Sequence, residues 1–196
     1  MYKTIMSVVL ILMALQCWGE ENRGLLATPL EEFAHRSNVN IIFAQEAAHI
    51  SSDKTSVTIT AIVLETEEQP IQEMRGIRVN LANEKSTDQV YLDAQGISEV
   101  LSDVKLLRQA IILEGLENEE VYGMKIRGTG SRWCLHPKPL VHTLCPEYYR
   151  TQESSGIMIR PVKGTTNVPW FLLSGHKPVE LEDAINAGVL ILDNIK

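Results

Sequence analysis

The feature that most constrains the fold of this chain is one amphipathic helical pattern set between two regions of strand-like sequence. Apolar residues recur at intervals of three and four: Ile97, Val100, Leu101, Val104, Leu107 and Ile111. Asp93 precedes this pattern and can cap the helix. The other face carries polar residues: Ser98, Glu99, Asp103, Lys105 and Arg108. Because one apolar stripe buries one side of a helix, we expect this helix to lie across a sheet.

Alternating apolar and polar residues predict strands before this helix, over 39–43, 55–64, 76–81 and 89–92. The last two stretches have the spacing of a hairpin with a long turn. The polar stretch 65–70 ends in proline and is the best candidate for a boundary inside the chain. We therefore expect three segments: residues 1–19 as a signal peptide, 20–69 as a helix–strand segment that could form a subdomain, and 70–196 as an α+β domain.

Residues 28–34 predict a short helix, in which Thr28 can cap the N-terminus and Pro29 suits the first turn. This helix and the strand after it read PLEEFAHRSNVNIIFA. The stretch resembles the first half of the short N-terminal domain of secretins and TonB-dependent receptors. That domain continues with another strand and a second helix, and the sequence predicts no such helix before residue 70. The resemblance carries over no functional residue; it points to an envelope protein as a partner.

The region after the central helix has a β-rich texture. Short candidate strands, separated by Gly and Pro turns, cover 121–126, 132–136, 140–144, 156–159 and 168–173. A last short helix is predicted over 178–187, with Leu181, Ala184 and Ile185 on its apolar face. The expected fold class is α+β: antiparallel strands with one central amphipathic helix packed on a face, and a β-rich C-terminal half.

The first nineteen residues have the layout of a secretory signal peptide. Lys3 precedes an apolar run over 5–15, which as a helix would be roughly 16 Å long. A bilayer core is about 30 Å thick, so the run is too short to span it comfortably. Cleavage after Gly19 predicts a periplasmic or secreted protein without stable membrane insertion. The alternatives are an uncleaved membrane anchor and a lipid anchor at Cys17, where Gln16 departs from the small residue that lipoprotein signals place before the cysteine.

Composition and charge exclude several classes of protein. Hydrophobic residues make up 44% and charged residues 22%, as in ordinary globular proteins, which rules out collagen-like, coiled-coil and wholly disordered chains. The formal net charge is -7, from 18 Lys and Arg against 25 Asp and Glu. An acidic chain without a Lys/Arg run repels phosphate backbones and anionic membranes, so we expect no nucleic-acid partner.

Two cysteines of the predicted mature chain, Cys134 and Cys145, each have a histidine nearby. In an oxidising compartment we expect them to form a disulfide, worth about 2–3 kcal/mol by chain entropy. The alternatives are free thiols, or a zinc site formed by Cys134, His136, His142 and Cys145. On a strand Cys134 and His136 share a face, whereas His142 and Cys145 do not, which argues against four convergent ligands.

The sequence contains no nucleophile elbow, zinc-protease helix or phosphate-binding loop. We therefore assign no catalytic residue and no cofactor. The favoured interpretation is an exported, non-catalytic binding or envelope-structural module. The alternative is a hydrolytic or zinc-binding protein that uses the Cys134–Cys145 region, with His136 or His142 as a base. One further hypothesis is a small aromatic binding surface in the C-terminal region, formed by Trp133, Tyr148, Tyr149 and Trp170.

Overall fold

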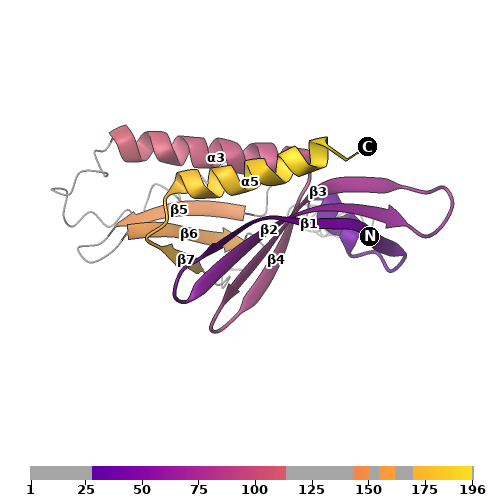
Figure 1. Cartoon of the computed structure of the whole chain (residues 1–196), viewed down its shortest axis with the longest axis horizontal. Coiled ribbons are helices and arrows are strands. Elements are labelled where there is room, and N and C mark those ends of the chain that lie inside the picture. The colour runs from indigo at the N-terminus through magenta and orange to yellow at the C-terminus, as the bar shows by residue number, and fades with distance from the viewer. Residues whose placement is uncertain (1–27, 114–143, 151–154, 162–169, 196) are drawn as a thin grey trace, which may run out of the picture.

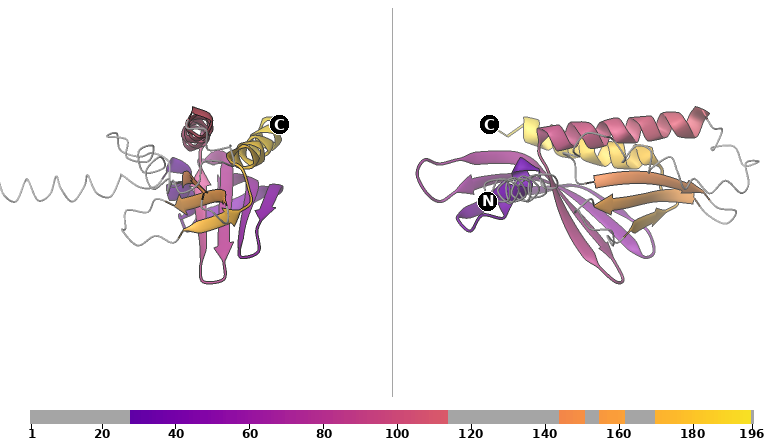
Figure 2. Two further views of the ribbon diagram at one scale, coloured as in Figure 1. Left: turned by 90° about the vertical axis from the view of Figure 1, so that its left-hand side faces the viewer. Right: turned by 180° about the vertical axis from the view of Figure 1, so that it is seen from behind.

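The computed structural model describes residues 28–113, 144–150, 155–161 and 170–195. These residues form two antiparallel sheets, with two long helices side by side above them (Figure 1). The α+β class and the antiparallel pairing predicted from the sequence are confirmed. The two helices lie on the same side of the sheets in the turned views as well (Figure 2).

The first sheet is a four-stranded meander in the order β1-β2-β3-β4. Its strands are β1 (Val39–Ser51), β2 (Thr55–Thr66), β3 (Glu73–Asn83) and β4 (Thr87–Leu92). The candidate boundary at residues 69 and 70 falls in the turn between β2 and β3, which pair from Thr55↔Asn83 to Glu65↔Glu73. Residues before and after this turn therefore contribute to one sheet.

Helix α2 (Pro29–Ala34) begins as predicted at Thr28, whose Oγ1 accepts a hydrogen bond from the Glu31 backbone N–H at 3.1 Å. It covers one end of the sheet face that points away from the long helices. Its apolar side packs with β2 residues in a separate cluster formed by Leu30, Phe33, Ile62 and Leu64. Gly76 of β3 allows this approach, because a Cβ there would lie 2.4 Å from Leu30 Cδ2 and 2.3 Å from the Leu92 carbonyl oxygen.

The second sheet has the order β5-β6-β7. It consists of β5 (Leu144–Arg150), β6 (Ser155–Pro161) and β7 (Phe171–Ser174). The extension of β5 through residues 145–150 was not predicted, because Pro146 and Glu147 interrupt the alternation. The proline is tolerated because β5 is an edge strand among the described residues, so one side of its backbone has no neighbouring strand to bond there. The predicted strands over 121–126, 132–136 and 140–143 lie outside the described residues.

The two long helices are α3 (Ala94–Leu113) and α5 (Pro178–Asp193). As predicted, Asp93 caps α3, with its Oδ1 accepting from the Gly96 N–H at 2.8 Å. The prediction of one central helix on the sheet was incomplete, because α5 continues to Asp193 and packs along β1, β2 and β3, while α3 packs against β5, β3, β4 and α5. Asp103 was expected on the solvent face of α3 and is instead buried.

One apolar core joins both sheets and both helices. Its members come from β2, β3, β6, β7 and α5, among other elements; they include Ile59, Ile77, Ile157, Phe171 and Leu181. Gly188 brings α5 close to the first sheet, since a Cβ at this position would lie 3.0 Å from Ile77 Cδ1. This shared core fixes the two sheets and the two helices relative to one another.

Candidate functional site

Of the predicted cysteine and histidine cluster, the structure describes one member. Cys145 is fully buried on β5, whereas Cys134, His136 and His142 lie outside the described residues. The disulfide and its zinc alternative therefore stay predictions. Among the described residues, no group of three or more His, Cys, Asp or Glu side chains is placed to hold a metal ion.

The predicted aromatic surface is only partly described. Trp133 lies outside the described residues, and the Tyr149 side chain is not described. Tyr148 is buried in a cluster with Leu107 and Ile111 of α3, so it packs in the interior instead of lining a surface. Trp170 is 40% exposed, and the Arg160 guanidinium carbon lies 5.0 Å from its ring centroid. One of the four predicted aromatic residues is thus shown at the surface.

Trp170 borders a cleft of about 470 Å³ at the tips of two hairpins of the first sheet, which we call the hairpin-tip cleft. Two hydrogen bonds fix β7 and the residue before it to these tips. Asn83 Nδ2 donates to the Trp170 carbonyl at 3.4 Å, and Ser52 Oγ donates to the Leu172 carbonyl at 3.2 Å. The cleft is lined by charges of both signs: Asp53, Lys54, Glu84 and Lys85.

A second feature is the free side of strand β1, which we call the β1 edge. Strand β1 has 13 residues, and within the described ranges no strand pairs with it on the side away from β2. Most of its side chains are exposed; Ile41 is 48% and Ile42 is 52% exposed. The strand contains no Lys, Arg or Pro. These are the residue types with which proteins usually protect an edge strand against pairing with another chain.

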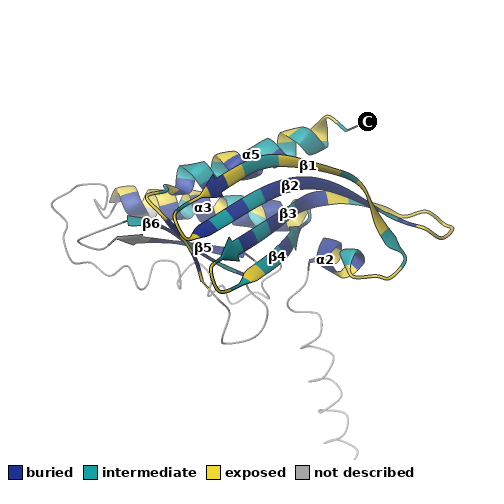
Figure 3. Cartoon of the chain, turned by 60° about the horizontal axis from the view of Figure 1, so that its bottom comes forward, coloured by how far each residue is buried: buried dark blue, intermediate teal, exposed yellow. Residues whose placement is uncertain are grey.

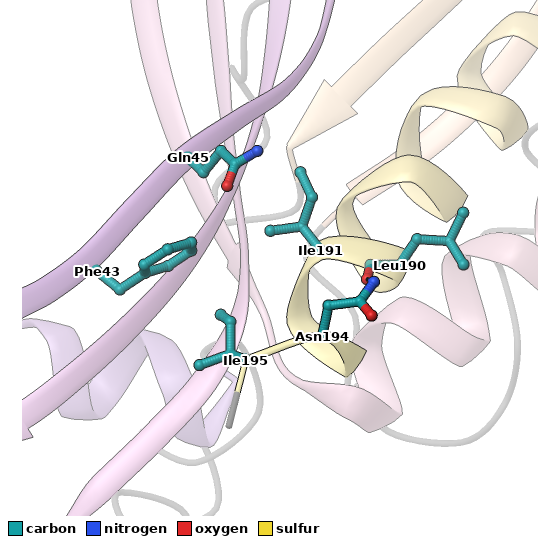
Figure 4. A pocket seen from close by; sticks show the side chains of 6 residues that line it. All are labelled: Phe43, Gln45, Leu190, Ile191, Asn194 and Ile195. Carbon is teal, nitrogen blue, oxygen red and sulfur yellow. Dashed lines mark hydrogen bonds between the residues drawn. The ribbon is translucent and has the colours of Figure 1, made fainter.

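A groove of about 440 Å³ runs beside the β1 edge, between β1 and the C-terminal part of α5; we call it the β1–α5 groove. Figure 4 shows Phe43 and Gln45 reaching from β1 towards Ile191 and Ile195. Leu190, 63% exposed, and Asn194 complete the lining. Four apolar side chains and two amide groups therefore line the groove, so it can take an apolar side chain and orient it by polar contacts.

Two β-bulges divide the β1 edge. The pairing of β1 with β2 shifts register between Ile41 and Phe43 and again between Glu46 and Ala48. Bulges twist an edge strand and shorten the ladder that it can offer. The regular stretch between them is 43–46, and it contains both β1 residues that line the groove. Of the three regular stretches of β1, 39–41, 43–46 and 48–51, the middle one therefore lies directly beside the β1–α5 groove.

The other end of β1 is tied to the start of α5 by a histidine. His176 contacts the Ser51 carbonyl through Nε2 at 2.8 Å and Glu180 Oε2 through Nδ1 at 2.5 Å. The hydrogen bond with Glu180 raises the pKa of His176 above its ordinary value, against an opposing effect of partial burial. Burial acts to raise the pKa of Glu180, but the bonds from His176 and the Lys177 backbone outweigh it and leave that pKa lowered.

A buried carboxyl group lies on the second sheet. Burial raises the pKa of Glu147, and the charge of Arg160 partly offsets this rise. Glu147 pairs with Met158, and Arg160 pairs with Cys145, so the two charged residues are diagonal neighbours on β5 and β6. A raised carboxyl pKa beside one cation is a common structural arrangement.

The sequence did not reveal the β1 edge. Only residues 39–43 were predicted as a strand, because 44–50 (AQEAAHI) do not alternate cleanly. The two bulges explain this, since each reverses the alternation between the faces of the sheet. The usable signal was the lack of Lys, Arg and Pro over 39–51.

The sequence matches no protein-family model, and a search of curated proteins finds no significant relative. In the described part of the chain, no helix combines the length and apolar character needed to cross a bilayer.

Proposed function

We propose that this chain is an exported, non-catalytic binding module that docks an extended segment of a partner protein on the β1 edge. The docked segment adds as a fifth strand beside β1 and places one apolar side chain in the β1–α5 groove. This mode of recognition takes affinity from backbone hydrogen bonds and specificity from pockets for alternate side chains. Export rests on the N-terminal signal-like sequence.

The observation that carries the proposal is the coincidence of an edge without a paired strand in the described ranges and a groove beside it. Exposed edge strands are liabilities, and a long one with exposed isoleucines and no Lys, Arg or Pro calls for a covering partner. The regular stretch 43–46 lies where Phe43 and Gln45 line the groove. An added strand would therefore pair with the regular stretch 43–46 and place a side chain in the β1–α5 groove at the same position.

Charge indicates the chemistry of the partner. The chain carries a formal net charge of -7, and the charged residue on β1 is Glu46. A second copy of the chain would bring like net charges together, whereas a neutral or basic segment would not. We therefore propose an extended segment with alternating apolar residues, at least one Lys or Arg, and no acidic residue opposite Glu46.

The test is selection of short linear peptides from a phage-displayed library on the purified chain, followed by affinity measurements with the enriched peptides. We expect alternating apolar residues with a basic residue among the selected sequences. Ile42→Lys places a charge on the edge, and Leu190→Lys places one at the groove. Each is expected to weaken peptide binding at least about tenfold, the effect of 1.4 kcal/mol.

Two matched control variants distinguish a loss of peptide binding at the β1 edge and groove from a general effect of added charge. Ile71, in the turn between β2 and β3, is 54% exposed against 52% for Ile42, and Ile112 on α3 is 64% exposed against 63% for Leu190. Ile71→Lys and Ile112→Lys should leave peptide affinity unchanged. Equal losses in test and control variants would contradict the proposal. So would dimerisation of the wild-type chain that Ile42→Lys abolishes, because the edge would then bind a second copy.

Export and the disulfide are tested on native protein by intact-mass measurement, with and without reductant and thiol labelling. The proposal expects a chain that begins at Glu20, with Cys134 and Cys145 joined. A full-length chain with labelled thiols would contradict both statements. A lipid mass at Cys17 would instead place the protein on a membrane surface.

A further inference from the structure

A different surface of the first sheet carries an arginine that forms no ion pair among the described residues. The sheet has two faces: α5 covers one, and among the described elements α2 covers one end of the other, which we call the open face (Figure 3). Arg78 of β3 lies on the open face, because it pairs with Thr60 of β2 and Tyr91 of β4, while its neighbours Ile77 and Val79 belong to the core beneath α5.

The Arg78 side chain is half-buried and lacks a counter-charge. Its Nε is shielded from solvent and has no hydrogen-bond partner, and in the described part of the chain no carboxylate forms an ion pair with it. Acidic residues lie on the neighbouring elements, Asp93 after β4, Glu46 opposite Thr60 on β1, and Glu31 on α2, but among the described residues none of them forms an ion pair with Arg78. A buried polar group without a partner is uncommon in proteins and calls for an explanation.

Comparison with Arg160 shows that a shielded guanidinium without a compensating contact is specific to Arg78 among the described arginines. Arg160 also has a shielded Nε without a hydrogen bond. Its guanidinium, however, stacks over Trp170 and lies close enough to Glu147 to lower the pKa of that carboxyl. Arg108 and Arg75 form ion pairs with Glu182 and Glu73. Among the described residues, Arg78 forms neither an ion pair nor a contact with an aromatic ring.

Neutral hydrogen-bonding groups surround Arg78 on the open face. Asn80 follows it on the same face of β3, and Gln89 pairs with Asn80. The Tyr91 hydroxyl accepts a hydrogen bond from Gln89 Nε2 at 2.7 Å, which leaves its own proton available for donation. The Tyr91 ring is held edge-on by His35, with 6.0 Å between the centroids. The donors are therefore positioned on a rigid sheet.

We infer that the open face binds a carboxylate group, which Arg78 contacts as the charged donor and the Tyr91 hydroxyl and Asn80 amide support as neutral donors. A planar guanidinium matches a carboxylate with two parallel hydrogen bonds. One cation among neutral donors balances one negative charge. A phosphate dianion would need more positive charge than this face supplies, on a chain that is acidic overall. The ligand class is an organic acid or the C-terminus of a peptide.

The experiment is an amide-resolved NMR titration of the folded chain at constant ionic strength. The probes are N-acetyl-Ala-Ala with a free carboxylate, the same dipeptide as its amide, acetate, and inorganic phosphate. We expect saturable shifts in β3 and β4 around Arg78 with the two carboxylates. The amide should cause none, and phosphate should bind more weakly than the acid. Acetate alone would indicate a small organic acid, and preference for the dipeptide would indicate a peptide terminus.

Arg78→Gln should weaken carboxylate binding at least about tenfold, because a charge-assisted pair is lost. Arg75→Gln is the matched control on the same strand and should change nothing. The thermal midpoint of Arg78→Gln should equal or exceed that of the wild type, since a structural arginine would instead lower it. Equal shifts with acid and amide, unchanged binding in Arg78→Gln, or tighter binding of phosphate than of carboxylate would each overturn the inference.

Discussion

The two edge strands of the first sheet, β4 and β1, differ in length and in what lies beside them. Strand β4 has six residues, and α2 lies beside it: Thr28 Oγ1 donates to the Tyr91 carbonyl at 2.6 Å while it caps α2. Gly76 lets Leu30 approach the neighbouring strand closely. Strand β1 has 13 residues, exposed isoleucines and a groove at its side. The β4 edge thus receives a hydrogen bond from Thr28, whereas within the described ranges no strand pairs with the outer side of β1.

This difference indicates where the molecule meets a partner. A six-residue helix is enough to bring a hydrogen-bond donor to the β4 edge, so the lack of a paired strand along β1 within the described ranges distinguishes the two edges. The bulges divide the ladder of β1 into the stretches 39–41, 43–46 and 48–51 without covering it.

The largest effect is expected from Gly76→Ala. The added Cβ would lie 2.3 Å from the Leu92 carbonyl oxygen, a backbone atom that cannot move without shifting β4. We expect a loss of about 3 kcal/mol in the free energy of unfolding, measured with denaturant. Gly96→Ala is the control, since its nearest contacts would be at 3.4 Å and alanine favours a helix. Equal stability of the two variants would show that the β4 edge is not closed as described.

A smaller loss is expected from Thr28→Val, which keeps the shape and removes the hydroxyl. The Glu31 N–H loses its acceptor and the Tyr91 carbonyl loses its donor, at a cost of about 1–2 kcal/mol. Amide exchange should accelerate in β4 and stay unchanged in β1. Thr87→Val, at the exposed start of β4, is the control. Acceleration in both edges would contradict independent closure of the β4 edge.

The smallest effect concerns His176, which ties the Ser51 end of β1 to α5. Because its pKa is raised in the folded state, the stability it contributes is complete below the ordinary pKa of 6.5 and is lost as the pH rises through the folded value. We expect about 0.5 kcal/mol, given the exposure of the pair. The partner Glu180 has a lowered pKa, so its share is present above 4.5 and is lost on acidification below it.

His176→Ala should remove the alkaline part of this pH dependence, measured by unfolding at several pH values. Glu180→Gln should reduce both parts. A wild-type stability that rises between pH 6 and pH 8 through this pair would contradict the assigned sign, because deprotonation of a histidine with a raised pKa can only weaken the folded state.

Helix caps and strand alternation, which are local sequence signals, predicted the helices and strands that depend on them. The Thr28 and Asp93 caps and the alternation in β2, β3 and β4 placed those elements correctly. The second half of β1, strand β5 and the length of α5 were missed for tertiary reasons. Bulges broke the alternation in β1. Pro146 is accepted in β5 because β5 is an edge strand among the described residues. Asp103 is buried by tertiary contacts that no local sequence pattern encodes.

The candidate sites depended almost entirely on tertiary structure. Trp170 was the one surface residue that the sequence singled out and the structure places on a cleft. The β1–α5 groove joins residues more than a hundred positions apart, and the environment of Arg78 is set by cross-strand pairing. Neither could be derived from spacing along the chain.

The most direct test of the central claim is hydrogen exchange of the chain with and without a peptide selected on it. Docking on the β1 edge predicts new protection confined to residues 43–46 of β1 and to the end of α5 around Leu190–Ile195, with β4 unchanged. Protection at the hairpin-tip cleft around Trp170, or peptide binding without any protection in β1, would contradict it.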